Sequence, residues 1–107
     1  MKKAIIILGA GVEQLDSYKF CKNLKVTTIG VDKNPLAEGL NHSNFKVNES
    51  IYKPDQIIKK IKKIKNIKVV GVVAVWVDCP KTIKELSKTF KLNTLKESIY
   101  NKVSTKI

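Results

Sequence analysis

Apolar residues occur along this chain in short uninterrupted runs separated by amphipathic segments. The runs KAIIIL (3–8), KVTTIGVD (25–32) and IKVVGVVAVWV (67–77) have the length and the β-branched content of buried strands, and NFKVN (44–48) is a shorter candidate. Continuous apolar runs of this length are typical of strands that are covered on both faces.

Three other segments space their apolar residues at helical intervals of three and four positions. They cover residues 13–24, the stretch opened by Pro54, and the stretch that follows Asp78, which is available as an N-cap. The apolar stripes consist of Leu15, Tyr18, Cys21 and Leu24 in the first, Ile57, Ile58, Ile61 and Ile64 in the second, and Ile83, Leu86 and Phe90 in the third. We expect a loose connection over 36–43, and one short strand at most with a final helical turn or two over 94–107.

Strands that alternate with helices predict an α/β fold, with a parallel sheet and helices on both faces. We expect a small Rossmann-like sheet of four to five strands, formed by residues 1–107 as a single domain, because a chain of 107 residues has room for one core. Ligands of such sheets bind beyond the carboxyl ends of the strands. The positions of interest are therefore 9–14, 32–34 and 76–80.

The first of these positions is a glycine turn, GAGVEQ (9–14), between a strand and a helix. A phosphate commonly binds such a turn, but Gln14 stands in place of the third glycine of G-x-G-x-x-G. If the turn faces a ligand, its backbone N–H groups are free, Gly11 has a conformation that only glycine tolerates, and Gln14 directs its amide toward the cleft that holds Asp32 and Asn34. Gln14→Ala would then barely change stability. The simpler alternative is that the glycines only permit a tight reversal.

Composition narrows the function further. The formal net charge is +12, but all 21 basic residues are lysine, and the absence of arginine argues against a nucleic-acid partner. No apolar stretch is long enough for a membrane span and no signal-peptide pattern is present, so we expect a cytoplasmic protein without a membrane partner. Cys21 and Cys79 are expected to be buried thiols and His42 to be solvated, and no residue spacing predicts a metal site.

The segments ILGAGVEQL and IGVDKNPLAEG resemble the N-terminal domain of ATP-grasp ligases. This pre-ATP-grasp fold precedes the nucleotide-binding domains of biotin carboxylase, of carbamoyl phosphate synthetase large subunits and of many carboxylate–amine ligases. IYKPDQIIKKIKK and VVAVWVDCPKTIKELSKTFKL are similar to later parts of the same domain, so the resemblance covers nearly the whole chain. Trp76 and Val77 depart from the pattern, because relatives often have a smaller residue and a threonine before the Asp.

The resemblance implies a substrate-side domain that is not catalytic by itself. The substrate-binding residues implied at this cleft are Gly9, Ala10, Gly11, Gln14, Asp32, Asn34 and Asp78. The implied partners are a small carboxylate or amine substrate and the downstream ATP-grasp domains. ATP and magnesium belong to those later domains, so we expect no cofactor in this chain, which would be an excised or truncated domain or a free-standing remnant. Whether it forms a homodimer stays open.

A dinucleotide-binding module, redox or regulatory, is the alternative. Asp32 follows Gly9 by 23 residues, the position of the acid that holds an adenosine ribose in Rossmann proteins. Gln14 argues against this alternative, because a bulky residue there blocks the close helix–strand packing that the third glycine permits.

Overall fold

Four parallel strands form one sheet in the computed structural model of the chain, which describes residues 1–92. The strands are β1 (Lys2–Leu8), β2 (Thr27–Val31), β3 (Phe45–Val47) and β4 (Ile67–Val73), arranged in the order β3-β2-β1-β4. The parallel α/β class predicted from the sequence is confirmed. The strand and helical turn expected over 94–107 lie outside the described residues.

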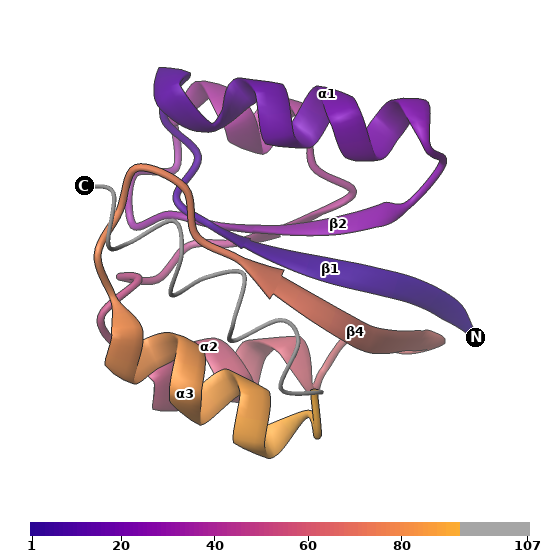
Figure 1. Cartoon of the computed structure of the whole chain (residues 1–107), viewed down its shortest axis with the longest axis vertical. Helices are drawn as coiled ribbons and strands as arrows, with labels where there is room; N and C mark the ends of the chain where they lie inside the picture. Colours follow the sequence, from indigo (N-terminus) through magenta and orange to yellow (C-terminus); the bar gives the residue numbers. More distant parts are fainter. Residues whose placement is uncertain (93–107) are drawn as a thin grey trace.

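Helices cover both faces of the sheet (Figure 1). On one face lies α1 (Leu15–Asn23), preceded by the short 3-10 helix η1 (Val12–Gln14) and packed against a second one, η2 (Glu38–His42). On the other face lie α2 (Pro54–Ile61) and α3 (Pro80–Thr89). The segment 36–43, expected to be a loose connection, is therefore largely the helical turn η2.

Side-chain alternation along β1 divides the core into two clusters, one on each face of the sheet. Ile6 and Leu8 pack with the apolar residues of α2 and α3, whereas Ile7 packs with Tyr18 of α1 and Leu40 of η2. Because β1 lies inside the sheet and is covered on both faces from Ala4 to Leu8, both faces of that part are apolar, as the uninterrupted run of the sequence predicts.

The end of α1 differs from the sequence pattern. After Asn23 the chain reverses, with the N–H of Lys25 bonded to the carbonyl of Lys22 at 3.0 Å and that of Val26 to Cys21 at 2.9 Å. Lys25 has φ of 58°, so the helix ends in the arrangement known as a Schellman motif. Leu24, expected on the buried stripe, is turned outward and is 59% exposed.

The approach to α3 also differs from expectation. Strand β4 ends at Val73, so the predicted strand was four residues too long. The N-cap of α3 is Cys79 in a non-helical conformation, with φ of −143° and ψ of 59° and with Pro80 in the first turn, so the N-cap expected at Asp78 is wrong. A residue that precedes proline is driven out of the helical region, which places the cap directly before Pro80. Residues 74–79 are left as a connection at the carboxyl edge of the sheet.

Candidate functional site

A cavity of about 320 Å³ opens where the four strands end. The chain passes from β1 to β2 and β3 on one side and later to β4 on the other, and ligands of open α/β sheets bind at such a switch in strand order. The cavity is lined by Gly9, Gly11, Glu13, Gln14, Asp32, Lys33, Ser50, Ile51, Tyr52, Trp76 and Val77.

The glycine turn after β1 already has partners for its backbone N–H groups. Gly9 donates to the carbonyl of Val31 at 2.7 Å, and Ala10 donates to Oδ2 of Asp32 at 2.9 Å. Gly11 donates to Oε1 of Gln14 at 2.8 Å. The expectation that these N–H groups are free for a ligand is therefore wrong, because protein oxygens take the places that a phosphate would take.

Gln14 is the residue that closes the turn. Its side-chain oxygen accepts the Gly11 N–H, and its Nε2 donates to the carbonyl of Val75 at 2.9 Å. The residue is only 4% exposed. Gln14 lines the same cavity as Asp32, as expected, but both ends of its amide are engaged in joining the turn to the connection after β4.

The two glycines of the turn have different conformations. Gly9 has φ of +94°, which disfavours any residue with a Cβ, and a Cβ there would approach Cδ of Gln14 to 3.2 Å. Gly11 has φ of −75° and ψ of −177°, an extended conformation open to any residue. The conformational requirement expected at Gly11 is therefore wrong, and it belongs to Gly9.

Tyr18 anchors the turn from the other side. Its hydroxyl donates to the Gly9 carbonyl at 2.9 Å, and its side chain is fully buried between α1 and the sheet. Burial, with a smaller contribution from the charge of Asp32, raises the pKa of Tyr18 far above its ordinary value. Tyr18 is thus a neutral hydrogen-bond donor with a structural role.

Asp32 organises the loop after β2. Besides the Ala10 N–H, its carboxylate accepts the N–H of Asn34 at 2.9 Å, and Oδ1 of Asn34 in turn accepts the N–H of Leu36 at 3.0 Å. Both side chains therefore form local turns of the kind that Asp and Asn favour. The carboxylate thus fixes the backbone on both sides of the cleft with one hydrogen bond to each of its oxygens.

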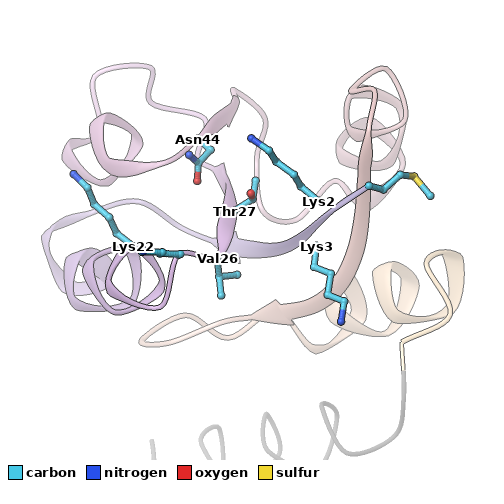
Figure 2. Close-up of a pocket in the computed structure, with 8 residues that line it drawn as sticks. Lys2, Lys3, Lys22, Val26, Thr27 and Asn44 are labelled. Atoms are coloured by element: carbon cyan, nitrogen blue, oxygen red, sulfur yellow. The ribbon is translucent and has the colours of Figure 1, made fainter.

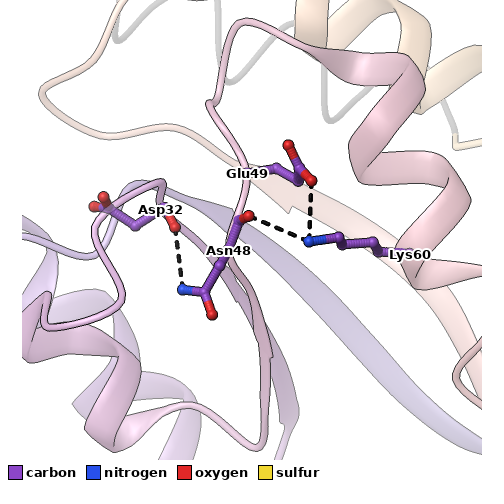
Figure 3. A network of polar contacts seen from close by, with 4 residues as sticks. All are labelled: Asp32, Asn48, Glu49 and Lys60. Atoms are coloured by element: carbon purple, nitrogen blue, oxygen red, sulfur yellow. Dashed lines mark hydrogen bonds and ion pairs between the residues drawn. The ribbon is translucent and has the colours of Figure 1, made fainter.

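A polar network continues from this loop to α2 (Figure 3). The side chain of Asn48 donates to the Asp32 carbonyl at 3.4 Å, and Lys60 of α2 donates to the Asn48 carbonyl at 3.3 Å. Lys60 also pairs with Glu49 at 2.9 Å. An exposed ion pair of this kind adds little stability, so the network matters chiefly by joining the ends of β2 and β3 to α2.

The substrate-binding residues implied by the resemblance divide into those that line the cavity and those that do not. Gly9, Gly11, Gln14 and Asp32 line the cavity, whereas Ala10, Asn34 and Asp78 are not among its lining residues. Ala10 is fully buried, and its N–H and carbonyl are taken by Asp32 and Gly39.

Ser50, Ile51 and Tyr52 line the cavity and were not predicted from the sequence. They follow β3, whose carboxyl end lies at the same edge of the sheet as those of the other strands. Applying the carboxyl-end rule to the predicted strand 44–48 as well would have found them.

Comparison with known proteins gives matches among solved structures, whereas no model of a protein family and no curated protein matches the chain. Phosphoribosylglycinamide synthetase from Anaerococcus prevotii is similar over 87% of this chain and 23% of that one, with a TM-score of 0.70 and 27% identity. N5-carboxyaminoimidazole ribonucleotide synthetase from Thermotoga maritima is similar over 85% of this chain and 23% of that one, with a TM-score of 0.55 and 16% identity. Both are ATP-grasp ligases, and the similarity lies in their N-terminal parts.

The chain has the pre-ATP-grasp fold. The resemblance noted in the sequence is confirmed, and the chain spans about a quarter of the length of the two ligases that it matches. The dinucleotide-binding alternative is not favoured. In this pre-ATP-grasp domain Gln14 occupies the turn where a dinucleotide would place its phosphates, and its Oε1 accepts the N–H of Gly11.

The cysteines, His42 and the metal-ligating residue types form no second candidate site in the part of the pre-ATP-grasp domain that the structure describes. Burial raises the pKa of the Cys79 thiol to about 11, with a further contribution from Asp78, and burial also raises that of Cys21. His42, expected in solvent, is half-buried. Within residues 1–92, no group of three or more His, Cys, Asp or Glu side chains could hold a metal ion, and no helix is long and apolar enough to cross a membrane.

A larger hollow of about 670 Å³ lies at the opposite, amino edge of the sheet (Figure 2). Lysines from the start of β1 and the end of α1 line it, together with Val26, Thr27 and Asn44. Lys2 and Lys3 are consecutive strand residues and point to opposite sides, so their ammonium groups do not converge on one ligand. Carboxylates gather instead at the carboxyl edge, where Glu13, Asp32 and Glu49 follow β1, β2 and β3. The domain therefore has one basic edge and one edge that carries acids.

Proposed function

We propose that this chain is the N-terminal, substrate-side domain of an ATP-grasp carboxylate–amine ligase of the carbamoyl-phosphate-synthetase-like type. The observation that carries the proposal is the similarity to phosphoribosylglycinamide synthetase over 87% of the chain. It is supported by a cavity at the switch in strand order, walled by the glycine turn and by the loops after all four strands.

The role proposed for the domain is to form one wall of the substrate cleft. ATP-grasp ligases activate a carboxylate as an acyl phosphate, which an amine then attacks. That chemistry needs positive charge arranged around the transferring phosphoryl group. Among the residues that line this cavity Lys33 is the only cation, and residues 1–92 contain no group of three or more His, Cys, Asp or Glu side chains that could hold a metal ion. We therefore assign ATP, magnesium and the phosphoryl transfer to other domains of the same enzyme, and the holding of a carboxylate or amine substrate to this one.

We also propose a cytoplasmic location. Cys21 and Cys79 are free thiols that belong to core clusters on opposite faces of the sheet, and such unpaired buried thiols are common in reducing compartments.

The first test is the reading frame beyond Ile107 and the activity of its product. We expect the frame to continue for about 200 residues or more, which one or two further domains need. The complete protein should release ADP from Mg-ATP only when both a carboxylate and an amine are supplied, whereas the 107-residue chain should release none. Release of ADP by the 107-residue chain, or reduction of NAD by the complete protein, would show that the proposal is wrong.

A cleft-filling variant tests the wall itself. Gly11 lines the cavity in an extended conformation, and a Cβ there meets first the flexible carboxylate of the exposed Glu13. In the complete protein Gly11→Ala and Gly11→Val should raise the KM for the carboxylate or amine substrate progressively, with the KM for ATP unchanged. Lys59→Ala, on the exposed face of α2, is the control. Equal KM values in all four proteins would exclude a substrate site at this cavity.

A further inference from the structure

Two exposed aromatic side chains stand at the cavity of the carboxyl edge. Trp76 and Tyr52 are each 66% exposed, and both line the 320 Å³ cavity. Neither belongs to the buried clusters that hold the helices on the sheet or to the side chains packed against them. Large aromatic side chains left in solvent at a concave site are therefore not explained by the packing of the described fold.

Trp76 is held there by an unusual backbone. Its φ is 64°, in the left-handed region that a bulky residue enters only at a cost. The preceding residue, Val75, is fixed through its carbonyl by Nε2 of Gln14. Because Oε1 of Gln14 also accepts the N–H of Gly11, the side chain of Gln14 joins the glycine turn to the connection 74–79 that carries Trp76. Trp76 follows β4, and the loops of Asp32 and Tyr52 follow β2 and β3 on the other side of β1 in the sheet, so the cavity is lined from both sides of β1.

The charged groups around these rings are two carboxylates, those of Glu13 and Asp32, and one cation, Lys33. The N–H groups of Gly9, Ala10 and Gly11 are engaged by protein oxygens, so they are not offered to a phosphate. The lining instead contains the carboxylates of Glu13 and Asp32. A carboxylate oxygen has more than one acceptor position, so each can take a further donor. Such a lining favours ligands that carry amino or hydroxyl donors.

We propose that Trp76 and Tyr52 form a stacking subsite for a planar nitrogen heterocycle, such as a nucleobase or an imidazole, whose amino groups or attached sugar hydroxyls donate to the carboxylates of Glu13 and Asp32. The inference rests on the proposed function in taking this cavity as the substrate cleft, and it adds the class of substrate. Electron-rich aromatic faces bind flat heterocycles by stacking, whatever their substituents. A cavity of about 320 Å³ is within the range of small-molecule sites.

Trp76 is the only tryptophan of the chain, so its indole N–H signal and its fluorescence report on this subsite alone. The 107-residue chain is titrated with adenosine, which has a ring and hydroxyls, with imidazole, and with ribose 5-phosphate, which has no aromatic ring. Adenosine should shift the indole signal and quench the fluorescence in a saturable manner, imidazole should do so more weakly, and ribose 5-phosphate should do neither.

Variants of Trp76 test whether adenosine binds by stacking on the indole. The affinity for adenosine is measured from the backbone amide signals of Gly11 and Asp32, which do not depend on the tryptophan. Trp76→Leu should weaken adenosine binding about tenfold, as expected for the loss of one stacked base, and Trp76→Phe should retain most of the affinity. Phe20→Leu is the matched control, because Phe20 is equally exposed on α1 but does not line the cavity. Unchanged affinity in Trp76→Leu would overturn the proposal.

Two other outcomes would overturn it as well. One is an indole signal that does not move at about 10 mM adenosine, a concentration that occupies even a site of millimolar affinity. The other is a complete protein in which the fluorescence that Trp76→Phe removes is already shielded and insensitive to adenosine, since the indole then packs against protein. If the complete protein still releases ADP with its substrates in these cases, the stacking subsite is wrong and the proposed function stands. If adenosine stacks on Trp76 but no ADP is released, the proposed function is wrong and the subsite stands.

Discussion

Replacing Gln14 by alanine tests whether the glycine turn is held by the protein itself. The substitution removes the acceptor of the Gly11 N–H and the donor to the Val75 carbonyl, at 2.8 and 2.9 Å. A hydrogen bond of this kind contributes about 1 kcal/mol net, and the buried methylene of the side chain adds about 0.8 kcal/mol. We therefore expect Gln14→Ala to lower the free energy of unfolding by about 2–3 kcal/mol. The expectation from the sequence, that stability would barely change, is revised accordingly.

Urea unfolding of the 107-residue chain measures this directly. With an m-value of about 1 kcal/mol/M for a small protein, the midpoint should fall by roughly 2 M. Glu13→Ala is the control, because Glu13 is the exposed neighbour on the same turn, and it should change stability by less than about 0.5 kcal/mol. Gln14→Glu keeps the acceptor but turns a carboxylate toward the Val75 carbonyl, so it should be destabilised at pH 7 and partly recover at acid pH, where the protonated carboxyl donates. A Gln14→Ala protein as stable as the control would refute the reasoning.

Three further predictions concern other parts of the cleft and core. Gly9→Ala should cost about 1–3 kcal/mol because φ is +94° there, whereas Gly11→Ala should cost less than about 1 kcal/mol; equal urea midpoints for the two variants would contradict the assignment. The pKa of Cys79 is raised from 9.0 to about 11 in the folded state, so stability is complete below pH 9 and falls as the pH rises toward 11. Cys79→Ala should show a smaller fall in urea midpoint over that range, and an identical fall would mean that the thiol does not contribute. NAD and NADP at about 0.1 mM should leave the melting temperature unchanged, because a stacking subsite of millimolar affinity stays nearly empty at that concentration, whereas a dinucleotide site with a dissociation constant of about 1 μM would add about 2.7 kcal/mol; a rise of that size that disappears in Asp32→Ala would favour the dinucleotide alternative.

Local patterns predicted the elements of this fold because each element is specified by its own residues. Continuous apolar runs gave β1, β2 and β4, and prolines in the first turn placed α2 and α3. The errors concern the end of α1 and the start of α3, where the backbone conformation rather than the apolar pattern sets the boundary. The reversal after Asn23 turns Leu24 outward, and Cys79, the non-helical residue before Pro80, is the N-cap in place of Asp78.

The interior of the candidate site was less predictable, for a different reason. The hydrogen bond from Gln14 to the Val75 carbonyl joins residues 61 positions apart, and nothing in either local sequence indicates it. The sequence showed that Gln14 stands in place of the third glycine of the motif. It did not show that the side chain of Gln14 accepts a hydrogen bond from the turn, as a bound ligand would. The sequence correctly predicted that Asp32 follows the carboxyl end of β2. Its hydrogen bond with the Ala10 N–H could not be predicted, because it depends on the pairing of β1 with β2.

The uneven distribution of charge between the two sheet edges affects how anions approach the domain. The molecule measures 30 × 28 × 27 Å, whereas the Debye length is about 8 Å at physiological ionic strength. The two edges are therefore screened from each other, and an anion near the cleft is governed by the carboxylates and Lys33 rather than by the net charge of +12. On a cation exchanger or any anionic surface the lysine edge should face the matrix. The domain would then adsorb in one orientation, with its cleft turned toward the solution.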